Sequence, residues 1–257
     1  PTLPGIIDSH AHIHSGVLGD DLPEILERAE AAGLVGIVTI GTTLADSQLA
    51  ATVARSIKGV YATAGVHPHD AVEHSEADLA EIRELAADPK CVAVGEIGLD
   101  YHYDHSPRDV QRHVFRTQMA IADELGRPVV VHTREAEADT EAILREFPGV
   151  IGVMHCYSSG PDLARIALDL GYMISFSGII TFNKAEAVRA IAAEVPLDRL
   201  MVETDCPFLA PVPFRGRPNE PAYVTVVAAK LAEIRGITPE ALVEATAGNT
   251  KRLFGLN

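Results

Sequence analysis

Residues 91–100 read CVAVGEIGLD, an apolar run that leads into a carboxylate between two glycines. A short, continuous apolar run is typical of a strand that is covered on both faces, as in a parallel sheet. Glu96 follows this run directly, and a buried carboxylate is costly unless it is paired or bound to a metal. The stretch therefore predicts a parallel strand at Cys91–Gly95 with a functional carboxylate at its carboxyl end.

Seven further stretches repeat the alternation of a short apolar run with a longer amphipathic segment. They predict strands at Gly5–Asp8, Gly36–Ile40, Tyr61–Gly65, Pro128–His132, Ile151–His155, Tyr172–Ser177 and Leu200–Glu203. The clearest helix is expected at residues 106–125, with Ser106 as its cap, Pro107 at its first position and Gly126 after its end. Eight such units predict one (β/α)8 TIM-barrel domain over residues 1–257, with a doubly wound open sheet as the alternative.

The composition argues against several classes of protein. Acidic residues outnumber basic ones by 36 to 21, which argues against a broad basic surface that grips nucleic acid nonspecifically. The three cysteines are isolated and lack CxxC spacing, so they fit reduced thiols better than a disulfide framework. No run approaches the roughly 18 apolar residues needed to cross a bilayer, and residues 1–14 lack a secretory-signal pattern. We therefore expect a cytoplasmic protein.

Metal-competent side chains mark the ends of most expected strands. They are His10, His12, Glu96, His132, His155 and Asp205. Each one alone has an ordinary alternative, such as a core histidine or a helix-capping carboxylate. In an eight-stranded barrel, however, the carboxyl ends of the strands converge at one mouth, where active sites lie. Together these residues predict a site for divalent ions such as Zn, Mn or Fe.

Six motifs, in chain order, resemble those of the TatD family of metal-dependent deoxyribonucleases, part of the amidohydrolase superfamily. They read DSHAH at 8–12, GVHPH at 65–69, GEIGLDY at 95–101, HTREA at 132–136, HCYS at 155–158 and ETDCP at 203–207. The string NEP at 219–221 is similar to a further family motif. The resemblance implies two divalent ions (Mg²⁺, Mn²⁺ or Zn²⁺) with Glu96 as the bridge. The implied ligands are His10, His12, Glu96 and Asp205 for one ion, and Glu96, His132 and His155 for the other.

The chemistry expected at such a site is hydrolysis by a hydroxide bridging two ions about 3.5–4 Å apart. Asp205 is the predicted general base, with Glu203 in support, although Asp205 as a pure ligand is an open alternative. His67 and Arg134, in the loops after two of the expected strands, are predicted to bind substrate phosphate or to polarise the leaving oxygen. Three aromatic residues are candidates for stacking on a nucleobase: Tyr101, Tyr157 and Phe208.

The family resemblance implies a DNA phosphodiesterase, and more narrowly a 3′-end exonuclease that binds single-stranded DNA or 3′ ends with low affinity. Two alternatives stay open. One is a hydrolase of carbonyl compounds (an amide, a lactone or an aminoacyl ester) at the same site. The other is a metal-binding protein without turnover, which is disfavoured because a structural site would close every coordination position. We expect no membrane association and no obligate protein partner, and the sequence leaves the metal and the natural substrate open.

Overall fold

The chain has the (β/α)8 fold, in which eight parallel strands alternate with helices. The computed structural model describes residues 1–256. The strands are β1 (Ile6–Ala11), β2 (Leu34–Thr39), β3 (Val60–Ala64), β4 (Cys91–Asp100), β5 (Val129–Arg134), β6 (Gly152–Met154), β7 (Met173–Phe176) and β8 (Leu200–Val202). They follow one another in chain order within one sheet. The predicted barrel is confirmed, because a doubly wound sheet would place non-consecutive strands side by side.

The internal contacts of the chain group it into two compact units. One comprises Pro1–Thr39 and the chain from Ile174 onward, and the other comprises Ile40–Met173. The first unit therefore holds β1, β2, β8 and nearly all of β7, whereas the second holds β3 to β6. The expectation of a single domain over residues 1–257 stays a prediction.

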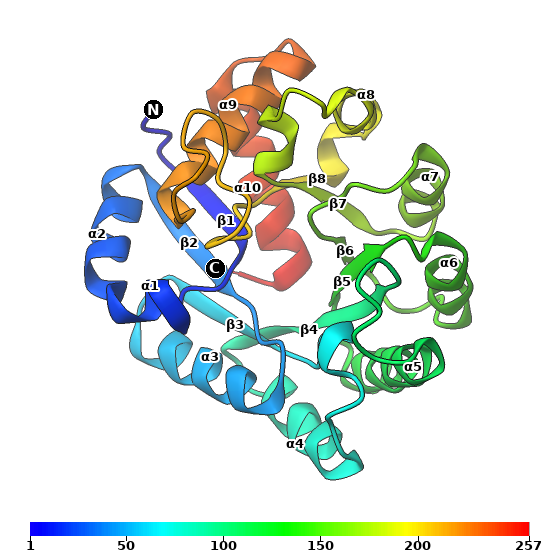
Figure 1. Ribbon diagram of the computed structural model, residues 1–257. Coiled ribbons are helices and arrows are strands. Elements are labelled where there is room, and N and C mark those ends of the chain that lie inside the picture. The colour runs from blue at the N-terminus through cyan, green and yellow to red at the C-terminus, as the bar shows by residue number, and fades with distance from the viewer. Residues whose placement is uncertain (257) are drawn as a thin grey trace. The chain divides into compact units, whose positions relative to one another are not determined.

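In the first unit, β1 pairs with β2 and β7 pairs with β8, all in parallel. Backbone hydrogen bonds join β1 to the segment after β8: the Asp205 N–H donates to His10 O (2.9 Å) and the His12 N–H donates to Cys206 O (2.8 Å). The helices are α1 (Gly16–Asp20), α2 (Leu22–Ala31), α8 (Glu186–Glu194), α9 (Val224–Arg235) and α10 (Pro239–Phe254). Helix α10 packs against β1 and β8, as Figure 1 shows for β1.

In the second unit, β3, β4, β5 and β6 pair in that order, again in parallel. The helices are α3 (Leu44–Ser56), α4 (Glu76–Ala86), α5 (Arg108–Leu125), α6 (Glu137–Glu146) and α7 (Pro161–Asp169). Helices α3 to α6 run along the outside of these strands (Figure 1). The side chains of Val129, Val130 and Val131 are fully buried, as the apolar run predicted.

Three strands continue further than the sequence predicted. β1 was expected to end at Asp8, β4 at Gly95 and β5 at His132, yet they reach Ala11, Asp100 and Arg134, respectively. The register of β4 with β5 shifts between Val94 and Ile97 and then resumes, with Gly98 opposite His132. Gly98 permits this pairing because a Cβ there would lie 1.9 Å from His132 O. His10 and Glu96 thus lie within strands, which restricts their orientation more than a loop would.

The start of α5 corrects one prediction. Ser106 was expected to cap this helix, but the helix begins at Arg108 and its N-cap residue is Pro107, which forms no side-chain cap. The Ser106 hydroxyl instead donates to His69 O (2.9 Å) and accepts from the Val72 N–H (3.0 Å). Ser106 therefore forms hydrogen bonds with backbone groups of the loop after β3 instead of with the first turn of α5. The predicted end is confirmed, since Gly126 adopts the left-handed conformation with φ of 61°.

Helix α5, with 18 residues, is the longest helix and is amphipathic. Val114, Phe115 and Met119 are buried, whereas Arg116 reaches outward to pair with Glu146 at 2.8 Å. Across residues 1–256, no helix is both long enough and apolar enough to cross a membrane. The cytoplasmic location stays a prediction.

Candidate metal centre

Three histidines surround one carboxylate oxygen in the unit that holds β3 to β6. Oε1 of Glu96 lies 2.8 Å from Nε2 of His155, 3.2 Å from Nδ1 of His132 and 3.4 Å from Nε2 of His67. Nδ1 of His132 and Nε2 of His155 also face each other at 3.4 Å. We call these four residues the β3–β6 cluster. It brings together three of the predicted metal ligands and the predicted substrate contact His67.

Burial and hydrogen bonding shift the pKa values of this cluster in opposite directions. Burial lowers the pKa of His67 to about 4, despite the attraction of Glu96, so this imidazole is neutral at neutral pH. For His132, burial disfavours the charged form, but hydrogen bonds with Asp100 and Glu96 outweigh it and raise the pKa. The Nε2 atom of His67 lies inside the cluster, and the predicted contact of His67 with substrate stays a proposal.

The arrangement of donor atoms fits a divalent metal ion. When His132 carries its proton on Nε2, the Nδ1 lone pair faces the Glu96 carboxylate and the second imidazole nitrogen, that of His155. Lone pairs gathered in a buried space repel one another unless a cation lies among them. Imidazole nitrogen and carboxylate oxygen are ligands of Zn, Mn and Fe in proteins. The ligand atoms of His67, Glu96 and His132 lie within 4.8 Å of one another, close enough to share an ion.

Asp100 contacts the ring nitrogen of His132 that lies opposite the one facing Glu96. Its Oδ2 lies 3.0 Å from Nε2 of His132 and 3.0 Å from Nε2 of His69. Its Oδ1 accepts two backbone N–H groups of the following loop, at 3.1 and 2.9 Å. Although burial opposes charge, the hydrogen bonds from the two histidines and the loop hold the pKa of Asp100 below its usual range. No role was predicted for Asp100, although it lies within the GEIGLDY string.

A second group of predicted ligands converges in the unit that holds β1, β2, β7 and β8. Oδ1 of Asp205 lies 3.4 Å from Nε2 of His10 and 3.5 Å from Nε2 of His12. A nitrogen of His10 also lies within 4.8 Å of a carboxylate oxygen of Glu203. We call these four residues the β1–β8 cluster. His10 is buried, whereas the side chains of His12 and Asp205 are about one-seventh exposed, at 15% and 14%.

Asp8 and Asn219 hold the segment that carries Asp205. Oδ1 of Asp8 accepts the Thr204 N–H (2.9 Å), and its Oδ2 accepts the Thr204 hydroxyl (2.6 Å). Burial raises the pKa of Asp8 to about 8. The Asn219 amide donates to Thr204 O (2.9 Å) and Phe208 O (2.7 Å). These contacts explain why an aspartate precedes the His-Ala-His string and why the NEP string carries an asparagine.

Arg134 stands apart from the metal-ligand atoms. It is the last residue of β5, its side chain is exposed, and its guanidinium lies 4.9 Å from the centre of the Tyr103 ring. A substrate role for Arg134 stays a proposal. Tyr103 itself was overlooked in the sequence, because a single tyrosine in a polar loop gives no periodic signal.

Of the three aromatic residues predicted to stack on a base, two are engaged elsewhere. Tyr157 is 2% exposed and donates its hydroxyl to Gly160 O, so it has no free face for a ligand. The Tyr101 ring lies beneath the Arg108 guanidinium at 4.3 Å, and its hydroxyl donates to Asp139. Phe208 is 60% exposed, and its ring centre lies 6.0 Å from that of His12. Only Phe208 keeps the predicted accessibility.

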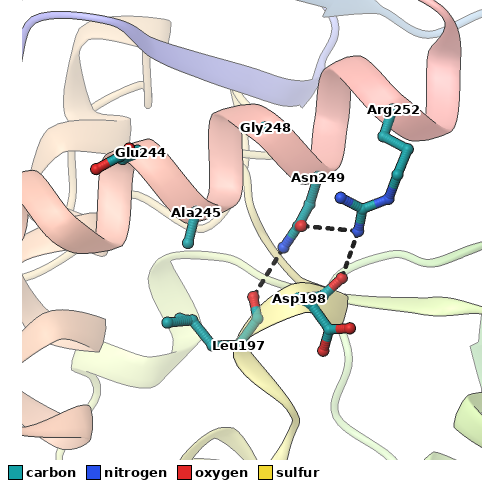
Figure 2. Close-up of a pocket in the computed structure, with 7 residues that line it drawn as sticks. All are labelled: Leu197, Asp198, Glu244, Ala245, Gly248, Asn249 and Arg252. Atoms are coloured by element: carbon teal, nitrogen blue, oxygen red, sulfur yellow. Dashed lines mark hydrogen bonds between the residues drawn. The ribbon is translucent and has the colours of Figure 1, made fainter.

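A surface cleft of about 360 Å³ lies away from these clusters, between α10 and the short helix η3 (Leu197–Arg199). Figure 2 shows the side chains of Asn249 and Arg252 directed at backbone carbonyls of the protein itself: Asn249 donates to Leu197 O and Arg252 donates to Asp198 O. The cleft lies before β8, whereas Asp205 follows it. Its polar groups fasten α10 to the start of β8, and no predicted ligand lines it.

Comparison with known proteins identifies the family of the chain. A family profile described as TatD related DNase matches residues 7–255. An uncharacterized metal-dependent hydrolase, YabD of Bacillus subtilis, is 42% identical over 98% of this chain and 100% of its own length. A 3′-5′ ssDNA/RNA exonuclease TatD of Klebsiella pneumoniae is 35% identical, with 98% of each chain covered.

The solved structures give the same result. The crystal structure of YjjV, a TatD homologue of Escherichia coli K12, superimposes with a TM-score of 0.93 at 30% identity, covering 98% of this chain and 99% of that one. The match extends over both units, and the imidazole and carboxylate groups needed for metal binding are present at the strand ends. The chain belongs to the TatD family and is a metal-dependent hydrolase.

Proposed function

We propose that this hydrolase cleaves phosphodiester bonds of DNA and removes nucleotides from the 3′ end of single strands. The observation that carries the proposal is the β3–β6 cluster, in which three imidazole nitrogens lie within 3.4 Å of Glu96 Oε1. Such a ligand set suits hydrolysis of unreactive esters. The exonuclease name of the Klebsiella pneumoniae relative, 35% identical to this chain, supports the choice of substrate.

We further propose that the two clusters together hold two divalent ions, with Glu96 as a ligand of both. Both clusters lie at the carboxyl ends of their strands, and a (β/α)8 barrel gathers these ends at one mouth. The ligands are His10, His12, Glu96 and Asp205 for one ion and Glu96, His132 and His155 for the other. When bound, the ions supply Lewis-acid activation of water and of the ester at neutral pH.

The remaining steps belong to side chains of this protein. Asp205 is our choice of general base: its carboxylate is partly exposed, so it can take a proton from water and return it to the leaving oxygen. Glu203, beside His10, stabilises the orientation of the residues around Asp205 without acting as the base. Arg134, with an exposed guanidinium, binds a phosphate of the strand through paired N–H groups. His67 contributes a neutral nitrogen within the cluster.

The test uses metal-stripped protein reconstituted separately with Mg²⁺, Mn²⁺ or Zn²⁺ and incubated with 5′-labelled single-stranded DNA. Wild type and a control, Glu240→Gln, which changes an exposed carboxylate on α10, should produce a ladder that shortens from the 3′ end. Glu96→Gln should leave the DNA intact. Intact DNA in every metal, with ions bound to the wild type, would overturn the nuclease proposal in favour of a carbonyl ester or amide substrate.

A further inference from the structure

An exposed group of aromatic and basic side chains lies near the β3–β6 cluster. The Tyr103 ring is stacked with that of His105, with an interplanar angle of 4° and centres 5.5 Å apart. The Arg134 guanidinium lies 4.9 Å from the centre of the Tyr103 ring. His69 meets Tyr103 and His105 edge-on, with ring centres 5.4 and 4.7 Å away. We call these four residues the Tyr103 platform.

Hydrogen bonds of Asp100 connect the platform to the β3–β6 cluster. The Tyr103 N–H donates to Asp100 Oδ1 (2.9 Å), and Nε2 of His69 lies 3.0 Å from Asp100 Oδ2. The same oxygen contacts His132, a member of the β3–β6 cluster. The loops that carry the platform follow β3 and β4, and Arg134 ends β5, so all four residues lie at the carboxyl ends of their strands. A substrate held at the cluster would extend over this surface.

Core packing does not account for the platform. Tyr103 is 51% exposed, and His105 and Arg134 are exposed as well. Among residues 1–256, no carboxylate forms an ion pair with Arg134 or His105, whereas the neighbouring His102 pairs with Glu135 at 2.8 Å. In a chain with 36 acidic and 21 basic residues, this leaves a surface of exposed aromatic rings in contact with a guanidinium that forms no ion pair with any described residue. Such a surface suits a ligand that is both aromatic and anionic.

We propose that the Tyr103 platform binds a nucleobase of single-stranded nucleic acid by stacking, next to the phosphodiester that is cleaved. This inference rests on the proposed function and assigns a base-binding subsite to it. Every base has a π face, so Tyr103 and His105 accept any of them. Arg134 binds the adjacent phosphate and fixes the position of the nucleic-acid strand relative to the site. The platform therefore contributes affinity for strands with bases without selecting a sequence.

The test measures binding without turnover. The parent protein is the Glu96→Gln variant, and the probe is a single-stranded oligonucleotide with 2-aminopurine near its 3′ end, whose fluorescence is quenched on stacking. Adding Tyr103→Leu should weaken binding about tenfold and reduce the quenching, because one stacking contact is lost. Tyr103→Phe keeps the ring and should restore both signals. Tyr61→Leu is the matched control, since Tyr61 lies near the start of β3 beside Lys90, at the opposite end of the strand.

A second probe separates stacking from loss of structure. An oligonucleotide with abasic residues near its 3′ end should bind the parent and the Tyr103→Leu variant equally. Equal affinity of these two proteins for the normal strand, with cleavage of that strand by the wild type, would overturn the platform alone. Failure of the wild type to cleave single-stranded DNA in any metal would overturn the proposed function and the platform with it.

Discussion

Nε2 of His132 lies 3.0 Å from Oδ2 of Asp100. A charged carboxylate at this distance keeps the imidazole proton on Nε2, because an acceptor requires a donor opposite it. The other nitrogen, Nδ1, is then the one that faces Glu96, at 3.2 Å. Asp100 thereby leaves Nδ1, the nitrogen on the side of Glu96, as the atom of His132 that carries a lone pair.

Replacing Asp100 should weaken metal binding. We expect Asp100→Ala to lower the affinity for divalent ions about 10- to 100-fold, the usual cost of removing the partner of a histidine ligand. Competition with a chromophoric chelator gives this affinity, and thermal unfolding shows whether the fold is intact. The control is Asp139→Asn, because Asp139 pairs with Tyr101 and Arg112 on the surface. Unchanged affinity in a folded Asp100→Ala protein would refute the positioning role.

Asn219 should matter for stability rather than for chemistry. Asn219→Ala leaves the buried carbonyl of Thr204 and the partly buried carbonyl of Phe208 without their donor, so we expect the free energy of unfolding to fall by about 2 kcal/mol. Urea unfolding measures the change. Asn183→Ala, at an exposed position, should change stability by less than about 0.5 kcal/mol. Equal effects of the two substitutions would contradict the assignment.

Cys91 gives a pH dependence of stability. Burial raises the pKa of this thiol from 9.0 to about 12, so both states keep the proton below about pH 9. Above that pH only the unfolded chain loses its proton, and the stability that Cys91 contributes declines as the pH rises toward 12. The stability advantage of wild type over Cys91→Ala should shrink by about 2 kcal/mol between about pH 8 and about pH 10.5. Denaturant unfolding at the two pH values checks this, and a constant difference would contradict it.

We predict that residues 1–257 unfold as one domain. A four-stranded half of a parallel sheet alone would expose unpaired strand edges, which is unfavourable for an isolated unit. Five of the six tyrosines lie in Ile40–Met173, so tyrosine fluorescence reports mainly on that unit while far-UV circular dichroism reports on both. The two signals should show the same urea midpoint. Separate midpoints would establish two domains.

The barrel could be predicted from the sequence, and the candidate ligands could be named, because both rest on local signals. Apolar runs mark the strands, and the residues at their ends, such as His132 and Glu96, share one edge in any parallel arrangement. The ends of β1 and β4 were predicted too early, because the apolar run of each strand stops before the strand does. In β4, Gly98 allows close pairing with β5 beyond the apolar run.

The supporting residues could not be predicted because their roles depend on long-range register. Asp100 meets His132 only because β4 and β5 pair with Gly98 opposite His132. Ser106 carries a helix-capping signature, yet its hydroxyl serves the loop after β3. Tyr157 and Tyr103 are equally aromatic in the sequence, and only the folded chain shows that one is buried and the other exposed.

The central claim is that Glu96 is a ligand of the ions on which hydrolysis depends. Its most direct test is the metal content of wild type, Glu96→Gln and the control Glu240→Gln, each stripped, incubated with Zn²⁺, dialysed and measured by plasma mass spectrometry. We predict two ions per chain in the wild type and the control, and the loss of at least one in Glu96→Gln. Equal metal content in wild type and a folded Glu96→Gln protein would contradict the claim.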